Sequence, residues 1–135
     1  MTRINVGVEP SELTDRHLLA EHREIKRIPN MVKAGRVRMD GIPDTFTLGK
    51  GHVKFFYDKL AFLRNRYSRI YAECVSRGFN VTNFSDAFSN IDTRYMGDYA
   101  PTEHDRSIIT ARISQRLAES KGSNRGYTVR VASTD

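Results

Sequence analysis

The sequence contains no tryptophan, one cysteine and four prolines among its 135 residues. Cys74 has no second cysteine to pair with, and one thiolate does not form a structural zinc site. No apolar run approaches the roughly 20 residues that cross a bilayer, and Arg3, Glu9 and Pro10 interrupt any signal-peptide core. These absences argue against a disulfide-stabilised scaffold and a membrane protein, and they predict a soluble, cytoplasmic protein.

The residues that are present have an ordinary globular composition with an excess of positive charge. Hydrophobic residues make up 39% and charged residues 28%, which with this length predicts one domain over residues 1–135. The net charge of +6 favours a polyanionic partner, because cationic side chains attract phosphates and release their counterions. Residues 1–77 carry 15 Lys/Arg against 9 Asp/Glu, residues 78–105 carry 1 against 5, and residues 106–135 carry 6 against 2. If the two basic segments fold onto one side, the protein has a basic face.

The hydrophobic pattern predicts a first helix within "SELTDRHLLAEHREIKRI", residues 11–28. Ser11 is a suitable N-cap for this helix, and Pro29 should bend or interrupt it. Four apolar residues recur at helical spacing and predict a buried stripe: Leu18, Ile25, Ile28 and Val32.

Two further helices are expected within residues 52–79 and 103–121. The first has a continuous apolar seam that ends in a packed Cys74, and Gly78 should stop it. The second begins with a capping box formed by Thr102 and Asp105 and should end at Gly122. The stretches between the helices are rich in glycine, proline and small polar residues. We therefore expect an all-α domain of three helices joined by long irregular loops.

The first helix carries a dense group of ionisable side chains. Three of them share one helix face, since they are four and three residues apart: His17, Glu21 and Glu24. Three arginines share a neighbouring face: Arg16, Arg23 and Arg27. Spacing alone favours a solvent-exposed surface with local ion pairs. It does not favour a metal site at His17 and Glu21, because no third ligand stands out.

Two other patterns concern anionic ligands. The stretch "LGKGH" lacks the spacing and the Lys-Ser/Thr ending of a Walker loop, so no nucleotide cofactor is predicted. Arg112 and Arg116 share one face of the third helix, and side chains at this spacing can bind successive phosphates.

Several blocks of the sequence resemble the phage pyrimidine-dimer DNA glycosylases, which are DNA glycosylases with an abasic-site lyase activity. The blocks are "MTRIN", "EHREIKR", "LGKGHVKFFYDKLAFL", "AECVSRGFN" and "GDYAP". The "GHVKFFYDK" block is long and specific, and the likeness extends from Thr2 to about Leu117. It implies a phage protein that acts on damaged double-stranded DNA in the host cytoplasm, and it suggests a monomer.

The resemblance implies a nucleophile at the amino terminus. In the family the initiating methionine is removed, and the α-amine of the next residue, here Thr2, attacks C1′ of the damaged nucleotide. An α-amine has a pKa of about 8, against about 10.4 for lysine, so more of it is unprotonated near neutral pH. The resulting Schiff base allows β-elimination, which breaks the strand without a metal or cofactor.

The resemblance also assigns the remaining site residues. The essential carboxylate corresponds to Glu24, with Glu21 as the nearby competitor, and His17 has a lesser positioning or protonation role. The phosphate-binding arginines correspond to Arg3, Arg23, Arg27, Arg112 and Arg116. They would hold a kinked backbone while the nucleotide opposite the lesion is flipped out.

The tail from about residue 123 departs from the family, whose well-known members end in a segment rich in Trp and Tyr. Tyr127 is the single aromatic residue here. Lys26 and His22 also stand where a proline and an aromatic residue are usual. Two alternatives therefore stay open beside a dimer-specific repair enzyme. One is a lyase that nicks abasic or other DNA with little dimer preference, and the other is a non-catalytic basic DNA-binding protein.

Overall fold

The computed structural model describes residues 2–119 of the chain, and within this range it contains α-helices, 3-10 helices and no β-strand. The α-helices are α1 (Asp15–Glu24), α2 (Arg27–Lys33), α3 (His52–Phe55), α4 (Leu60–Ser76) and α5 (Glu103–Glu119). The 3-10 helices span Pro10–Glu12, Ser85–Phe88 and Thr93–Tyr95. The predicted all-α class is confirmed. The predicted helix end at Gly122 and the divergent tail lie outside the described residues.

The first predicted helix is divided into a 3-10 turn, α1 and α2. Ser11 is not the N-cap of α1, because it lies inside the 3-10 turn that begins at Pro10. Thr14 is the N-cap instead: its backbone is extended, and its Oγ1 accepts a hydrogen bond from the His17 amide at 3.1 Å. Both residue types cap helices well. A proline at the first position favours a separate turn at residue 10, which moves the start of α1 to Asp15.

Pro29 interrupts the helix as predicted, although it lies inside α2. A proline at this position has no N–H to donate to the Ile25 carbonyl, and its ring crowds that carbonyl. The α-helical pattern therefore breaks at Ile25 and Lys26, where the Ile28 amide bonds the Ile25 carbonyl in a tighter 3-10 pattern. Glu24 is the last residue of α1 and Arg27 the first of α2 as a result.

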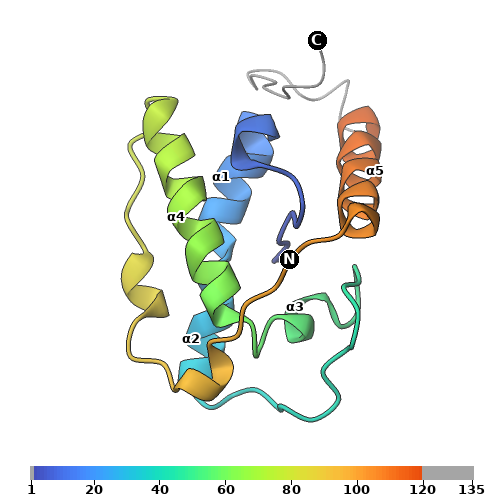
Figure 1. The fold of residues 1–135 in the computed structure, drawn as a ribbon. Helices are drawn as coiled ribbons and strands as arrows, with labels where there is room; N and C mark the ends of the chain where they lie inside the picture. The colour runs from blue at the N-terminus through green and yellow to red at the C-terminus, as the bar shows by residue number, and fades with distance from the viewer. Residues whose placement is uncertain (1, 120–135) are drawn as a thin grey trace.

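Helix α4 forms the centre of the core, packed against α1 (Figure 1). The single helix expected within residues 52–79 is divided into α3 and α4, and Phe56 of the predicted seam lies at the end of α3. The seam is nevertheless buried over its whole length: Phe56, Leu60, Leu63, Tyr67, Ile70 and Cys74. Burial raises the pKa of the Cys74 thiol to about 11, so this cysteine is a packed core residue. Gly78 adopts a φ of 85° after the helix, and the Phe79 amide bonds the Cys74 carbonyl at 3.0 Å, which completes the predicted stop.

Helix α5 begins with the predicted capping box. The Asp105 amide donates to Thr102 Oγ1 at 3.0 Å, and the Thr102 amide donates to Asp105 Oδ2 at 3.1 Å. In Figure 1, α5 stands apart from α1 and α4, with the N-terminal chain between them. Gly7 lets the N-terminal chain approach α5 closely, since its φ is 82° and a Cβ added there would lie 3.0 Å from the Cβ of Arg106.

Candidate active site

The first residues of the chain are buried and held from several sides. Among residues 2–8, which we call the N-terminal segment, Thr2 is 9% exposed, Asn5 is 3% exposed, and Ile4, Val6 and Val8 belong to the core. Arg106 of α5 donates to the Gly7 carbonyl at 2.8 Å, and Arg66 of α4 donates to the Val8 carbonyl at 3.0 Å. This segment is therefore a fixed part of the fold and not a frayed end.

His52 holds the same segment close to Thr2. Its Nε2 accepts a hydrogen bond from the Ile4 amide at 2.9 Å, so its Nδ1 carries the proton and donates to the Thr47 carbonyl at 2.8 Å. Burial lowers the pKa of His52, which favours this neutral form. The histidine of "LGKGH" therefore positions the chain two residues after Thr2. Sequence reasoning rejected a nucleotide site here but missed this role, for which the sequence contains no local signal.

A cavity of about 190 Å³ lies beside the N-terminal segment, and we call it the Glu24 cavity. It is lined by Arg3, Asn5, Arg16, His17, Ala20, Glu21, Glu24 and Arg116. These residues come from the N-terminal segment, α1 and α5, so the cavity exists only in the assembled fold. The side chain of Glu24 is 14% exposed, and one of its oxygens lies 3.7 Å from Nη2 of Arg23.

Glu21 and Glu24 have different surroundings although they share a helix face. The Glu21 carboxylate is buried, and it accepts hydrogen bonds from Asn5 Nδ2 at 2.7 Å and Arg66 Nη2 at 3.0 Å. A further short bond joins Arg66 Nε to its second oxygen. Glu21 is therefore committed to a buried ion pair that links α1 to α4. Glu24, at the end of α1, has the better access to a ligand in the cavity.

A second cavity of about 690 Å³ adjoins the first, and we call it the Arg112 cavity. Its lining residues are Arg3, Leu48, Gly49, Ile108, Ala111, Arg112, Gln115 and Arg116. Burial and the positive charges of Arg112 and Arg116 lower the pKa of Arg3, and Glu24 opposes this effect. The two cavities share Arg3 and Arg116, so together they form a cationic recess on either side of these residues.

His17 lines the Glu24 cavity as a partly buried side chain. Its Nδ1 lies 2.7 Å from Oγ1 of Thr14, the N-cap of α1. Burial lowers the pKa of His17, and the charges of Arg16, Arg3 and Arg116 lower it further. The neutral ring is therefore favoured near pH 7, and it can exchange protons or hydrogen bonds without adding positive charge.

The structure brings together five of the eight predicted site residues around the two cavities: Arg3, His17, Glu24, Arg112 and Arg116. Thr2 lines neither cavity, but it directly precedes Arg3, which lines both. Arg23 and Arg27 are exposed and lie outside both linings.

Sequence reasoning missed two polar residues that line the Glu24 cavity. Arg16 was grouped with the surface arginines, and Asn5 was not considered. The i, i+4, i+8 spacing of Arg16 with Ala20 and Glu24 was the available signal for Arg16. Asn5 had none, because its position depends on the contact with Glu21.

Residues 2–119 contain no group of three or more His, Cys, Asp or Glu side chains that could hold a metal ion. Within the same range, no helix has the length and apolar character needed to cross a membrane.

Two carboxylates and three arginines line one small cavity, and a second cationic cavity adjoins it. A cationic recess of this kind in a helical protein is typical of a binding site for a polyanion. Residues 1–86 match the family model described as pyrimidine dimer DNA glycosylase. This match covers more than half of the 135 residues, so the chain belongs to the pyrimidine dimer DNA glycosylase family. DNA is the substrate of such enzymes. Thr2, Arg3 and Glu24 lie within the matched range, whereas Arg112 and Arg116 lie beyond it.

Proposed function

We propose that this protein is a DNA glycosylase with abasic-site lyase activity, in which the α-amine of Thr2 is the nucleophile and Glu24 the acid–base. The observation that carries the proposal is the Glu24 cavity. There, Arg3 from the chain start, Glu24 from α1 and Arg116 from α5 surround one sugar-sized space. The anchored N-terminal segment supports the proposal, because a reacting amine must be held in place to act efficiently.

The reaction requires that Met1 be removed, since the Thr2 nitrogen is otherwise an amide. The amine attacks C1′, the C1′–base bond breaks, and the base leaves with a proton. The sugar ring then opens to an iminium ion joined to Thr2. Removal of a proton from C2′ breaks the C3′–O bond, because the iminium accepts the electron pair. On an abasic site the same amine condenses with the sugar aldehyde and releases water.

Glu24 serves this chemistry as both a charge and a proton carrier. Its carboxylate stabilises the cationic imine, which the surrounding arginines would otherwise destabilise. It also takes the proton from C2′ or passes protons to the leaving groups. The ion pair of Glu21 with Arg66 makes Glu21 less suited to this role.

The arginines hold the DNA backbone. Arg3, Arg112 and Arg116 meet at the two cavities and are suited to the phosphates beside the lesion. Arg23 and Arg27, exposed near the junction of α1 and α2, extend the contact along the strand. A DNA backbone held by arginines at several phosphates can be kinked so that the nucleotide opposite the lesion flips out.

Borohydride trapping on three duplexes tests the proposal. One duplex contains a cyclobutane pyrimidine dimer, one an abasic site, and one no damage. We expect a covalent adduct with both damaged duplexes, formed by reduction of the imine. Adducts with abasic DNA alone would favour the second candidate, a lyase with little dimer preference, which the absence of tryptophan from the whole chain supports. Protein with a verified Thr2 terminus that forms no adduct would contradict both.

The salt dependence of DNA binding tests the arginine assignments. Arg116→Gln should weaken binding to every DNA sequence and reduce the slope of log Kd against log salt by about 1, because one phosphate contact is lost. Arg94→Gln is the matched control, since Arg94 is exposed, pairs with Asp92 and lies within residues 78–105, where acidic residues outnumber basic ones. An equal change of slope in both variants would contradict a specific role for Arg116.

A further inference from the structure

Two buried side-chain polar atoms have no hydrogen-bond partner among the described residues: Asn5 Oδ1 and Arg112 Nε. Asn5 lines the Glu24 cavity and Arg112 lines the adjoining one. Leaving a buried polar atom unpaired is unfavourable, so folded proteins rarely keep one without a ligand or water to bond it. Each atom therefore needs a partner that the described residues do not supply, and Asn5 has no role in the reaction described above.

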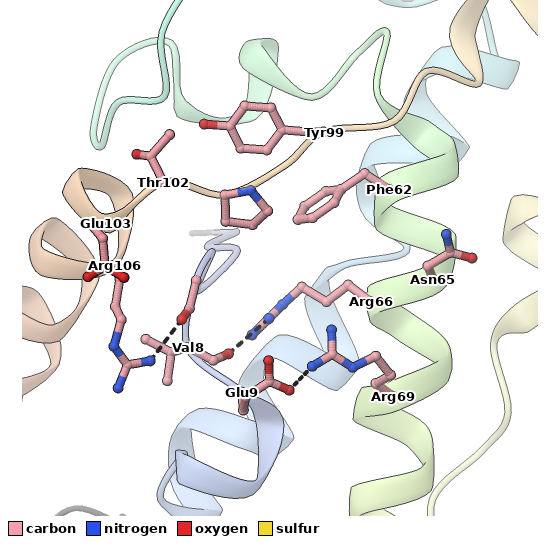
Figure 2. A pocket seen from close by; sticks show the side chains of 12 residues that line it. Val8, Glu9, Phe62, Asn65, Arg66, Arg69, Tyr99, Thr102, Glu103 and Arg106 are labelled. Atoms are coloured by element: carbon pink, nitrogen blue, oxygen red, sulfur yellow. Dashed lines mark hydrogen bonds and ion pairs between the residues drawn. The ribbon is translucent and has the colours of Figure 1, made fainter.

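The orientation of the Asn5 amide follows from its neighbours. Its Nδ2 donates to Glu21 Oε1 at 2.7 Å, so the opposite orientation would place two acceptors against each other. Glu21 is held in turn by Arg66, which also donates to the Val8 carbonyl, as Figure 2 shows. Arg66 and Glu21 are therefore positioning residues for Asn5. The side chain is 3% exposed, and its acceptor atom is fixed before any ligand arrives.

Another candidate cavity lacks such an atom. A separate cavity of about 410 Å³ lies between α4, α5 and the N-terminal segment (Figure 2). Each of its three arginines has a carboxylate partner: Arg66 pairs with Glu21, Arg69 with Glu9, and Arg106 with Glu12. No buried side-chain atom among its described lining residues is unpaired. The unpaired acceptor on Asn5 is thus the stronger indication of a ligand contact.

We propose that Asn5 contacts the substrate, and that its Oδ1 accepts a hydrogen bond from the C1′ hydroxyl of an abasic deoxyribose. Oδ1 can only accept a hydrogen bond, so it cannot bond a phosphate or the sugar ring oxygen, which are acceptors too. A hydroxyl of the sugar can donate to it. At about 190 Å³ the cavity is smaller than the roughly 300 Å³ of typical small-molecule pockets, so it suits a sugar better than a base pair. The inference rests on the proposed function, and it adds a residue that orients C1′ toward the Thr2 amine.

Two unreactive DNA ligands isolate this hydrogen bond. A duplex with a borohydride-reduced abasic site keeps the C1′ hydroxyl, and a duplex with a tetrahydrofuran site lacks it. The wild-type protein should bind the reduced site about tenfold more tightly, the upper range for one neutral hydrogen bond. Asn5→Leu should bind the two duplexes equally. Asn65→Leu, the same change at an exposed position of α4, should keep the full preference.

The comparison of two ligands on one variant removes general effects of the substitution. A loss of fold stability would weaken both complexes, and the greater flexibility of the reduced sugar affects wild type and control alike. Asn5→Ala is the second variant, because its smaller side chain lets water reach Glu21 if Asn5→Leu does not fold. A preference that persists in the Asn5 variants, or is absent from the wild type, would overturn the inference. The trapping experiment reports on the proposed function separately, since it measures imine formation by Thr2.

Discussion

Inserting one alanine between Met1 and Thr2 should reduce the borohydride-trapped adduct with abasic DNA by at least about a thousandfold. The variant still exposes an α-amine after methionine removal, but that amine is displaced by one residue, about 3.8 Å along the chain. The contact of Ile4 with His52 fixes the following residues, so the segment cannot slide to compensate. A displacement of even 1 Å can cost about a hundredfold in rate.

Two measurements and one control variant make this result decisive. Mass spectrometry establishes the terminal residue of each protein, and binding to tetrahydrofuran DNA shows whether the arginines still engage the backbone. Thr2→Ser is the matched control: it keeps the terminal amine and a small second residue, and it should form adduct within about tenfold of wild type. Wild-type trapping by the insertion variant would show that the nucleophile is not the terminal amine.

Glu24→Gln should lower strand cleavage by about 10²- to 10⁴-fold while DNA binding stays within a few-fold. The amide keeps the shape of the side chain but can neither neutralise the imine nor carry a proton. Stability should change little, because the Arg23 side chain that lies 3.7 Å from Glu24 is 60% exposed, and such exposed ion pairs contribute little to the free energy of unfolding. Single-turnover cleavage, equilibrium binding and urea unfolding measure the three quantities.

Glu21→Gln is the comparison that separates the two carboxylates. It leaves Arg66 buried without its counter-charge, and breaking a buried pair in this way costs about 3–5 kcal/mol in the free energy of unfolding. We therefore expect a large shift in the urea midpoint, with cleavage by the folded fraction within about tenfold of wild type, because Glu21 acts on the substrate only through Asn5. If Glu21→Gln were stable but inactive, and Glu24→Gln cleaved normally, the catalytic carboxylate would be Glu21.

Local patterns predicted much of the fold because they depend on neighbours in the chain. The apolar seam through Tyr67 to Cys74 repeats at the period of a helix, and it is buried as expected. The capping box of Thr102 and Asp105 needs only a spacing of three residues. The choice of Ser11 as N-cap was wrong for a local reason too, since the turn at Pro10 competes with the helix start.

Spacing could not separate Glu21 from Glu24, because both lie on one face of α1. Their difference comes from Arg66, 45 residues away in sequence, and from Asn5, which α1 meets only when the N-terminal segment is buried. The family resemblance favoured Glu24 as the catalytic carboxylate. The buried ion pair of Glu21 with Arg66 supports the same choice independently.

By itself the sequence determined the helical class, the buried seams and the residues capable of the chemistry, since periodicity, capping and residue type are local properties. Only the tertiary structure decided which of those residues meet. Arg116 of α5 reaches Arg3 because α5 packs on the N-terminal segment through Arg106 and Gly7. The buried, unpaired acceptor of Asn5 also depends on long-range packing that no local pattern encodes, because Asn5 meets Glu21 of α1 only when the N-terminal segment is buried.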